Sequence, residues 1–190
     1  MYPQLDWTKL SGPMMTSAKT MAIKSQVLEW RRQEPKCKTI IFTQFTGLLQ
    51  ILNRICKVER WKHSEISGKA TMKNRNKIIK EFNKPKGDVE ILIATQGTCG
   101  TGLNLTAATK VLIVESWWNE AMDQQAFCRV WRIGQTKETE LVRLCVDKSM
   151  DSRVLQIQQR KIARFGKIKM GKGLSKYVSS TIHQVATKIV

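Results

Sequence analysis

Residues 89–115 read VEILIATQGTCGTGLNLTAATKVLIVE, and this stretch decides the fold class. Two short apolar runs, 89–94 and 110–115, flank a connection rich in glycine. Runs of this length and polarity are typical of strands that are buried on both faces of a sheet. Glycines let the backbone pass close to a neighbouring group, although a glycine-rich loop alone is weak evidence for a site. The stretch therefore predicts two strands of a buried sheet.

Strand-like and helix-like segments alternate on both sides of this stretch. This alternation is typical of β-α-β units and predicts an α/β fold with three layers, in which a mainly parallel sheet is covered by helices on both faces. We expect strands at 38–45, 64–68, 89–94, 110–115 and 138–146, and helices at 17–33, 47–58, 72–83, 119–131 and 152–165. We expect one domain over 17–165, a lead-in at 1–16 and a basic flexible tail at 166–190.

The charge of the chain points to an acidic partner. Its 190 residues carry a formal net charge of +18, which favours nucleic acid. The five cysteines form no C-x-x-C pair, so we expect neither a zinc site nor a disulfide framework, no metal ligands, and an intracellular, reducing compartment. No signal peptide and no apolar run of transmembrane length are evident.

The usual nucleotide-binding motifs are missing from these residues. A P-loop needs G-x-x-x-x-G-K-[ST], and none is present, nor is a D-E-x-[HD] run that would hold magnesium. Ligands of parallel sheets bind at the carboxyl ends of the strands. We therefore expect the chain to complete such a site from across a cleft, and not to form it alone.

Two arginines are the best candidates for that contribution. The spacing of Gln125, Arg129 and Arg132 places them on one face of the expected 119–131 helix, which Gly134 would end at the ligand-binding edge of the sheet. A guanidinium supplied from a neighbouring domain stabilises the charge that spreads over a transferring phosphoryl group. In the simpler alternative, both arginines face solvent or pair with Glu138 or Glu140.

The wider context resembles the SWI/SNF-type DNA translocases of helicase superfamily two. Five elements match that family in order, over about residues 17–161. They are IIFTQF (40–45) like motif IV, ISGKATMKNRNKIIKEFN (66–83) like motif IVa, ILIATQGTCGTGLNLTAA (91–108) like motif V, DQQAFCRVWRIGQ (123–135) like motif VI, and MDSRVLQIQQRK (150–161) like the helix that follows it.

The resemblance implies the second RecA-like lobe, the helicase C-terminal domain, of a DNA-dependent ATPase. It implies arginine fingers at Arg132 and Arg129. It implies ATP-side residues at Gln125, Gly100, Gly102 and Asn104, and DNA-backbone contacts at Thr43, Gln44, Gly68, Arg75 and Thr95. ATP with Mg²⁺ is the implied cofactor, the Mg²⁺ being held by a first lobe that carries the P-loop. Without that lobe, we expect the 190 residues to be inactive.

The same resemblance implies double-stranded DNA, a first RecA-like lobe and nucleosomes as partners, in the nucleus, for remodelling or repair. An alternative is a truncated or degenerate fragment that binds DNA without catalysis. An RNA helicase lobe fits less well, because its H-R-x-G-R motif is absent.

The chain departs from the family pattern at several positions. Cys99 stands where a glycine is usual, and Gly97 where an arginine or lysine is common, which removes one phosphate contact. Trp131 lies between the two arginines, as in variants of fungal members, and Glu120 replaces a proline. We expect the pair Trp117-Trp118 to pack in the core or at a lobe interface.

Overall fold

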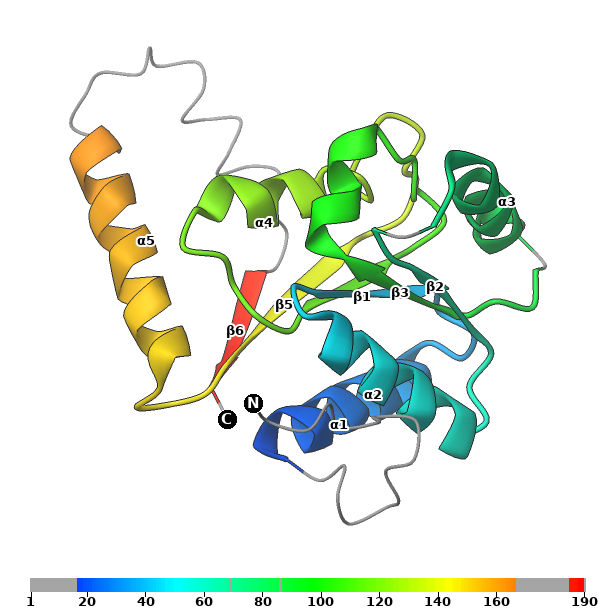
Figure 1. Ribbon diagram of the computed structural model, residues 1–190, viewed down its shortest axis with the longest axis horizontal. Coiled ribbons are helices and arrows are strands. Elements are labelled where there is room, and N and C mark those ends of the chain that lie inside the picture. The colour runs from blue at the N-terminus through cyan, green and yellow to red at the C-terminus, as the bar shows by residue number, and fades with distance from the viewer. Residues whose placement is uncertain (1–16, 69, 86, 167–184, 190) are drawn as a thin grey trace, which may run out of the picture.

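A six-stranded, all-parallel sheet organises the molecule, with strand order β2-β3-β1-β4-β5-β6 (Figure 1). The computed structural model describes residues 17–68, 70–85, 87–166 and 185–189. The strands are β1 (Thr39–Thr43), β2 (His63–Ile66), β3 (Ile91–Thr95), β4 (Lys110–Ile113), β5 (Glu140–Cys145) and β6 (Val185–Ile189). Because all strands run the same way, their carboxyl ends share one edge, which is at the left of the sheet in Figure 1.

Helices cover both faces of this sheet, which confirms the expected three layers. Below the sheet in Figure 1 lie α1 and α2, while α3, η3 and α4 lie above it and α5 follows β5. Their bounds are α1 (Ala18–Gln33), α2 (Thr46–Val58), α3 (Met72–Asn83), the 3₁₀ helix η3 (Gln96–Thr101), α4 (Glu120–Phe127) and α5 (Met150–Gly166). Among the described residues, no helix is long and apolar enough to cross a membrane.

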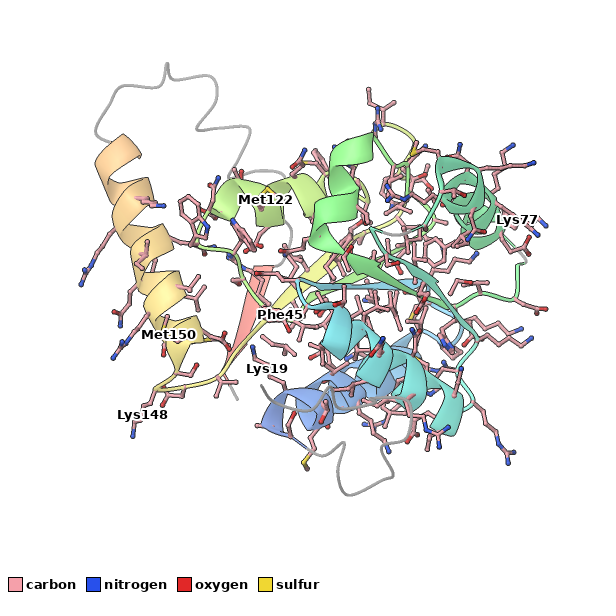
Figure 2. All side chains as sticks on the ribbon, in the orientation of Figure 1. Lys19, Phe45, Lys77, Met122, Lys148 and Met150 are labelled. Atoms are coloured by element: carbon pink, nitrogen blue, oxygen red, sulfur yellow. The ribbon has the colours of Figure 1, made fainter. Side chains whose placement is uncertain are left out.

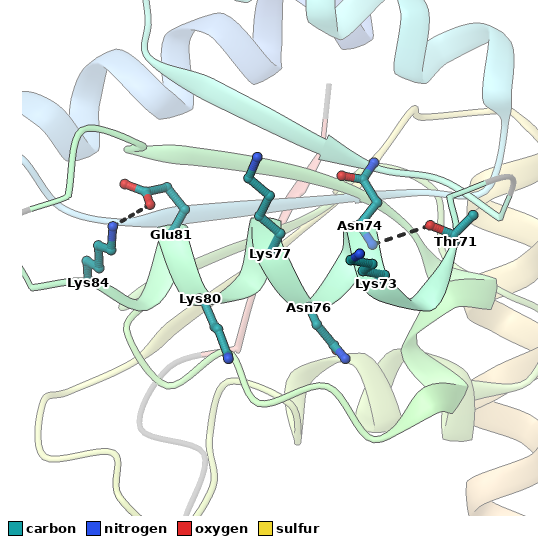
Figure 3. Close-up of a pocket in the computed structure, with 8 residues that line it drawn as sticks. All are labelled: Thr71, Lys73, Asn74, Asn76, Lys77, Lys80, Glu81 and Lys84. Carbon is teal, nitrogen blue, oxygen red and sulfur yellow. Dashed lines mark hydrogen bonds and ion pairs between the residues drawn. The ribbon is translucent and has the colours of Figure 1, made fainter.

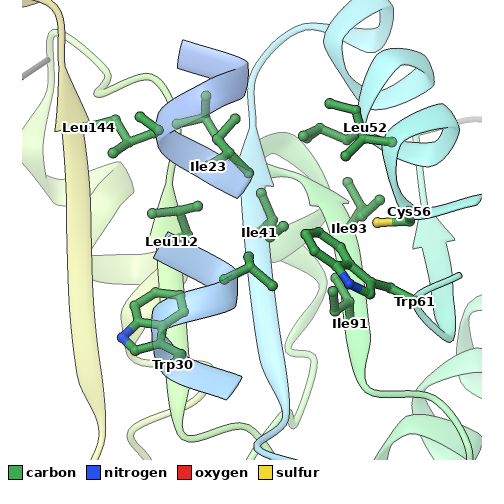
Figure 4. Close-up of a cluster of buried hydrophobic side chains, with 14 of the residues drawn as sticks. Ile23, Trp30, Ile41, Leu52, Cys56, Trp61, Ile91, Ile93, Leu112 and Leu144 are labelled. Atoms are coloured by element: carbon green, nitrogen blue, oxygen red, sulfur yellow. The ribbon is translucent and has the colours of Figure 1, made fainter. Parts of the chain in front are cut away.

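Alternation along the strands builds two hydrophobic cores. Ile41 and Ile93 are paired in register and face α1 and α2, where Figure 4 shows them beneath Ile23. Their neighbours Ile40 and Leu92 point to the opposite face, into the core beneath α3 and α4. All four strand side chains are at most 1% exposed, so the central strands are apolar on both faces because both faces are covered.

Helix α1 forms where it was expected and buries one of its faces against the sheet. Ser17 forms a capping box with Thr20, which satisfies backbone N–H groups at the start of the helix. Ile23 and Trp30 are each 1% exposed, whereas Met21 is 58% exposed and Leu28 39%, so α1 buries the face that contains Ile23 and Trp30.

The expected element bounds agree with the structure to within two residues except at three places. Helix α4 ends at Phe127 and not at residue 131. The glycine-rich loop after β3 is helical over its first part, as η3. The expected flexible tail, 166–190, includes the last residue of α5 and strand β6, which pairs with β5. The rest of that tail, and the lead-in at 1–16, lie outside the described residues.

Candidate nucleotide and DNA contact site

The carboxyl end of β1 is held by a buried glutamate. The Thr43 hydroxyl donates to Glu115 Oε2 over 3.0 Å, and the Gln44 backbone N–H donates to the same oxygen over 3.1 Å. The Gln44 side chain donates to the Glu115 carbonyl over 3.1 Å. Burial raises the pKa of the Glu115 carboxyl, while the bonds from Gln44 and Thr43 act to lower it. Thr43 is itself fully buried, so its hydroxyl supports the loop from inside the protein.

The loop after β2 is tied to α3 by a buried arginine. Arg75 Nη2 donates to the Gly68 carbonyl over 3.0 Å and to the Ser67 carbonyl over 3.4 Å. Arg75 is only 9% exposed, whereas Gly68 is exposed. The structure therefore brings these two expected residues together, with Arg75 bonded to the loop carbonyls that lie on the same edge as Thr43.

A buried polar hub lies where β3 passes into η3. The Gln96 amide donates to Asp123 Oδ1 over 3.1 Å, which joins η3 to α4. The Gln158 amide donates to the Trp117 carbonyl over 2.6 Å and to Asp123 Oδ2 over 3.3 Å, which adds α5 to the hub. Burial raises the pKa of the Asp123 carboxyl, against the bonds from Gln158 and its other donors. Thr95 precedes the hub directly and is 8% exposed.

The two arginines lie beyond the end of α4. The chain leaves the helix through a turn, and the Arg129 carbonyl accepts a bond of 2.9 Å from the Leu105 N–H. A second turn begins at Arg132, whose carbonyl accepts a bond of 2.9 Å from the Gln135 N–H. Gly134 has a φ of +102° in this turn, a conformation that favours glycine. Arg132 is exposed and Arg129 is partly buried.

Gln135 fixes the Arg132 turn to the chain that enters β4. Its side-chain amide donates to the carbonyls of Thr106 and Ala108 over 3.0 Å and 2.8 Å. These bonds leave Arg132 exposed on a turn that is anchored on both sides. Glu140, one of the expected alternative partners of the arginines, pairs instead with Lys110 at 3.0 Å.

The expected placement of the arginines was wrong in two respects. Arg129 and Arg132 do not share a helical face with Gln125, because α4 ends before them. They also lie at the amino edge of the sheet, beside the segment that enters β4, and not at its carboxyl edge. The reason is that α4 begins after the carboxyl end of β4 and runs back across the sheet (Figure 1).

Segment 96–104 also runs from the carboxyl edge of the sheet toward its amino edge, beside α4. Helix η3, which contains Gly100, packs against α4 and ends at Thr101; the next residue, Gly102, has a φ of +69°. Asn104 is exposed, and its carbonyl accepts a bond of 2.8 Å from the Asn83 amide. The expected DNA-side residues therefore lie at the carboxyl edge, while the two arginines, Gly102 and Asn104 lie toward the amino edge, joined by η3 and α4.

Several residues of this arrangement were not expected from sequence. They are Glu115, Gln96, Asp123, Gln158 and Gln135. The first four are polar but nearly fully buried. Gln96, Asp123 and Gln158 lie inside the stretches that resemble family motifs, but no role was expected for them. Within the described ranges, no group of three or more His, Cys, Asp or Glu side chains is placed to hold a metal ion.

Comparison with known families decides which group this lobe resembles. Residues 18–134 match the family model of the helicase conserved C-terminal domain. The chain belongs to this helicase C-terminal family. The match contains both the η3 segment and the whole of α4, and it ends within the turn that carries Arg132.

Relatives of this helicase C-terminal chain include proteins of chromatin and of DNA repair. It is 37% identical over 147 residues to a SWI/SNF-related matrix-associated actin-dependent regulator of chromatin subfamily A member 3-like 1 from Arabidopsis thaliana, which covers 76% of this chain and 17% of that protein. It is 35% identical over 150 residues to the DNA repair protein RAD5 of Gibberella zeae, which covers 79% of this chain and 13% of that protein. The chain thus spans less than a fifth of either relative.

A solved structure supports the same assignment. The C-terminal part of the Fun30 ATPase domain matches with a TM-score of 0.73 and 29% sequence identity, over 78% of this chain and 47% of that one. The helicase C-terminal chain therefore has the RecA-like fold expected from its motifs, with SWI/SNF-related and RAD5 relatives.

Proposed function

We propose that this chain is the C-terminal motor lobe of an ATP-dependent double-stranded DNA translocase that acts in chromatin remodelling or DNA repair in the nucleus. In this proposal, Arg132 and Arg129 act on ATP held by a first lobe, and the carboxyl edge contacts the DNA backbone. Two features support the proposal: membership of the helicase C-terminal family, and relatives named for chromatin regulation and DNA repair.

The observation that carries the proposal is a pair of hydrogen bonds between segments 96–105 and 120–129, which contain η3 and α4. At the carboxyl edge, the Gln96 amide donates to Asp123 over 3.1 Å. Toward the amino edge, beyond the ends of η3 and α4, the Leu105 N–H donates to the Arg129 carbonyl over 2.9 Å. Two segments joined at both ends transmit a displacement at one edge to the other, since packed elements shift together. A displacement caused by DNA contact at Thr95 would thereby shift the position of the two arginines.

The arginine turn fits the chemistry of a transferring phosphoryl group. Arg132 is exposed and its backbone is fixed by bonds to Gln135, so only its side chain has to be ordered when its planar fork reaches a partner. Gly102 offers open space, because an added Cβ there would meet nothing within 4 Å. Gly100 and Asn104, with Gln125 on α4, complete the nucleotide side. Mg²⁺ would be held by carboxylates of the first lobe.

The DNA side combines exposed backbone with buried supports. The Gly68 backbone N–H and the second N–H of the Gln44 side-chain amide would donate to phosphates, because the Gln44 backbone N–H is already bonded to Glu115. Glu115 and Arg75 hold the two loops. Phosphate contacts carry no sequence information, which suits a motor that tracks any duplex. The net charge of +18 supports such contacts.

The test joins this chain to the P-loop lobe of a relative and measures ATP hydrolysis with and without duplex DNA. We expect DNA-stimulated turnover from the two-lobe protein and none from the 190 residues alone, which contain no P-loop. A two-lobe protein that binds ATP and DNA but never hydrolyses ATP would instead support the alternative of a degenerate DNA-binding fragment.

A further inference from the structure

Helix α3 presents a row of lysines on the face opposite its buried side. Lys73, Lys77 and Lys80 are separated by four and three residues, which places them on one face of the helix, and Lys84 follows as its C-cap. All four are exposed. The buried residues of the same helix, Arg75, Ile79 and Phe82, fall on the other face. The lysines are therefore not needed for the packing of α3.

This lysine row lines a shallow groove of about 720 Å³ (Figure 3). The other lining residues are Thr71, Asn74, Asn76 and Glu81. Glu81 pairs with Lys84 at 2.6 Å, which neutralises the acidic residue of the groove. Over the described part of the chain, no ion pair involves the three lysines at 73, 77 and 80. Figure 2 shows Lys77 at the outer surface of the molecule.

The composition of the groove selects a sugar–phosphate backbone over a protein partner. No aromatic or large apolar side chain lines it, so it offers neither a stacking platform for bases nor a pocket for the apolar anchors that protein interfaces use. Cations beside small amide and hydroxyl groups are the usual contacts to phosphates and sugars. Lys73 and Lys80 are separated by about 10 Å along the helix axis, roughly the rise of three base pairs.

The groove is continuous with the proposed DNA edge. Helix α3 begins directly after the loop at the carboxyl end of β2, and Arg75 on α3 bonds the Gly68 carbonyl of that loop. Strand β2 is the outermost strand on this side of the sheet, so nothing in the sheet lies beyond it. We propose that the α3 groove is a second nucleic-acid backbone site, which holds duplex DNA that continues past the strand contacted at the carboxyl edge. This inference rests on the proposed function, because it extends the same DNA path.

The test measures binding of the 190-residue chain to a random-sequence duplex of about 30 base pairs across a salt series. The variant Lys73→Gln/Lys77→Gln/Lys80→Gln removes three lysines while keeping good helix formers. A matched control, Arg32→Gln/Arg54→Gln/Lys57→Gln, removes three exposed cations from α1 and α2 on the opposite face of the sheet. Circular dichroism and thermal melting establish that both variants are folded.

We expect the α3 variant to flatten the slope of log K against log[salt] by about 2 to 3, since each phosphate contact contributes about 0.9, and the control to change it by less than about 1. Equal losses in both variants, or no loss in the α3 variant, would overturn the inference. So would a polyglutamate peptide that binds the wild type but not the α3 variant while DNA binding is unchanged. A wild type that binds DNA with no salt dependence would refute the proposed function itself.

Discussion

Gln96 and Asp123 are joined by a hydrogen bond of 3.1 Å although 27 residues separate them, and each is 2% exposed. This contact fastens the start of η3 to α4 inside the protein. Its position matters because Gln96 directly follows Thr95, a proposed DNA contact, and α4 leads to Arg129. A change at this bond should therefore affect communication between the two edges more than binding at either one.

Gln96→Met should uncouple ATP hydrolysis from DNA in the two-lobe protein. The thioether keeps the volume of the side chain but removes the donor, which leaves Asp123 with one bond fewer and costs about 1–3 kcal/mol of stability. We expect the stimulation of hydrolysis by DNA to fall several-fold while the DNA-free rate stays within about twofold. Gln156→Met, the same change at an exposed position of α5, is the control. Undiminished stimulation in Gln96→Met would show that the hub is only structural.

Glu115→Gln should flatten the pH dependence of stability. Both Thr43 and Gln44 donate to one oxygen, Oε2, so an amide oxygen placed there keeps both bonds without a buried charge. The folded pKa of Glu115 is raised from 4.5 by burial, so its contribution to stability is present below pH 4.5 and is lost as the pH rises through the folded pKa.

Urea unfolding of wild type and Glu115→Gln between pH 4 and 8 measures this effect. We expect the variant to gain stability relative to the wild type as the pH rises across that window. Glu140→Gln, which breaks the ion pair with Lys110 at 3.0 Å, is the comparison and should give no such gain. A constant difference between Glu115→Gln and wild type at every pH would contradict the assignment.

Gly134→Ala should loosen the turn that carries Arg132. A side chain meets no atoms there, but the φ of +102° is strained for alanine, so we expect a loss of about 1 kcal/mol in stability and a lower kcat in the two-lobe protein. Gly97→Ala is a matched control, because it also has open space around an added Cβ but no positive φ. Equal thermal melting temperatures and rates for the two variants would mean that the turn conformation is unimportant.

Gly97→Arg should strengthen DNA binding. Gly97 is exposed, has no positive φ, and would place an added Cβ in open space, so arginine fits without strain. It lies in η3 next to the carboxyl edge, at the position where the motif V resemblance implies a cation. One new phosphate contact should steepen the salt slope by about 0.9, whereas Gly97→Ala should leave it unchanged. An unaltered slope for Gly97→Arg would place Gly97 away from the DNA.

The order of strands and helices could be predicted from sequence, because buried parallel strands are short apolar runs. The end of α4 could not. The residues after Phe127 keep helical spacing, yet the Arg129 carbonyl turns to the Leu105 N–H, and Val130 is fully buried by packing that no local pattern reveals. The arginines lie at the amino edge because α4 begins after the carboxyl end of β4 and runs back across the sheet, which the alternation of strands and helices already implied.

The polar supports were also beyond the reach of sequence patterns. Gln96, Asp123 and Gln158 meet only because η3, α4 and α5 converge, and their spacing along the chain carries no period. Trp118 was expected in the core or at a lobe interface. It is 55% exposed and so is not in the core of this lobe, and the Lys161 ammonium lies 4.2 Å from its ring centre. Another contact that no sequence pattern indicates is the ion pair of Lys19 and Asp151 at 2.8 Å, which joins α1 to the start of α5.

Single-turnover ATP hydrolysis by the two-lobe protein with saturating duplex DNA tests the central claim most directly, comparing wild type, Arg132→Lys and Arg132→Ala. If Arg132 stabilises charge on the transferring phosphoryl group, Arg132→Ala should lower the rate about 10³-fold or more, and Arg132→Lys should restore little of it, because the planar fork is lost. DNA affinity should be unchanged in both variants, since the turn lies at the edge of the sheet opposite Thr43. A near-normal hydrolysis rate in Arg132→Ala would show that the turn is only an exposed surface and contradict the account.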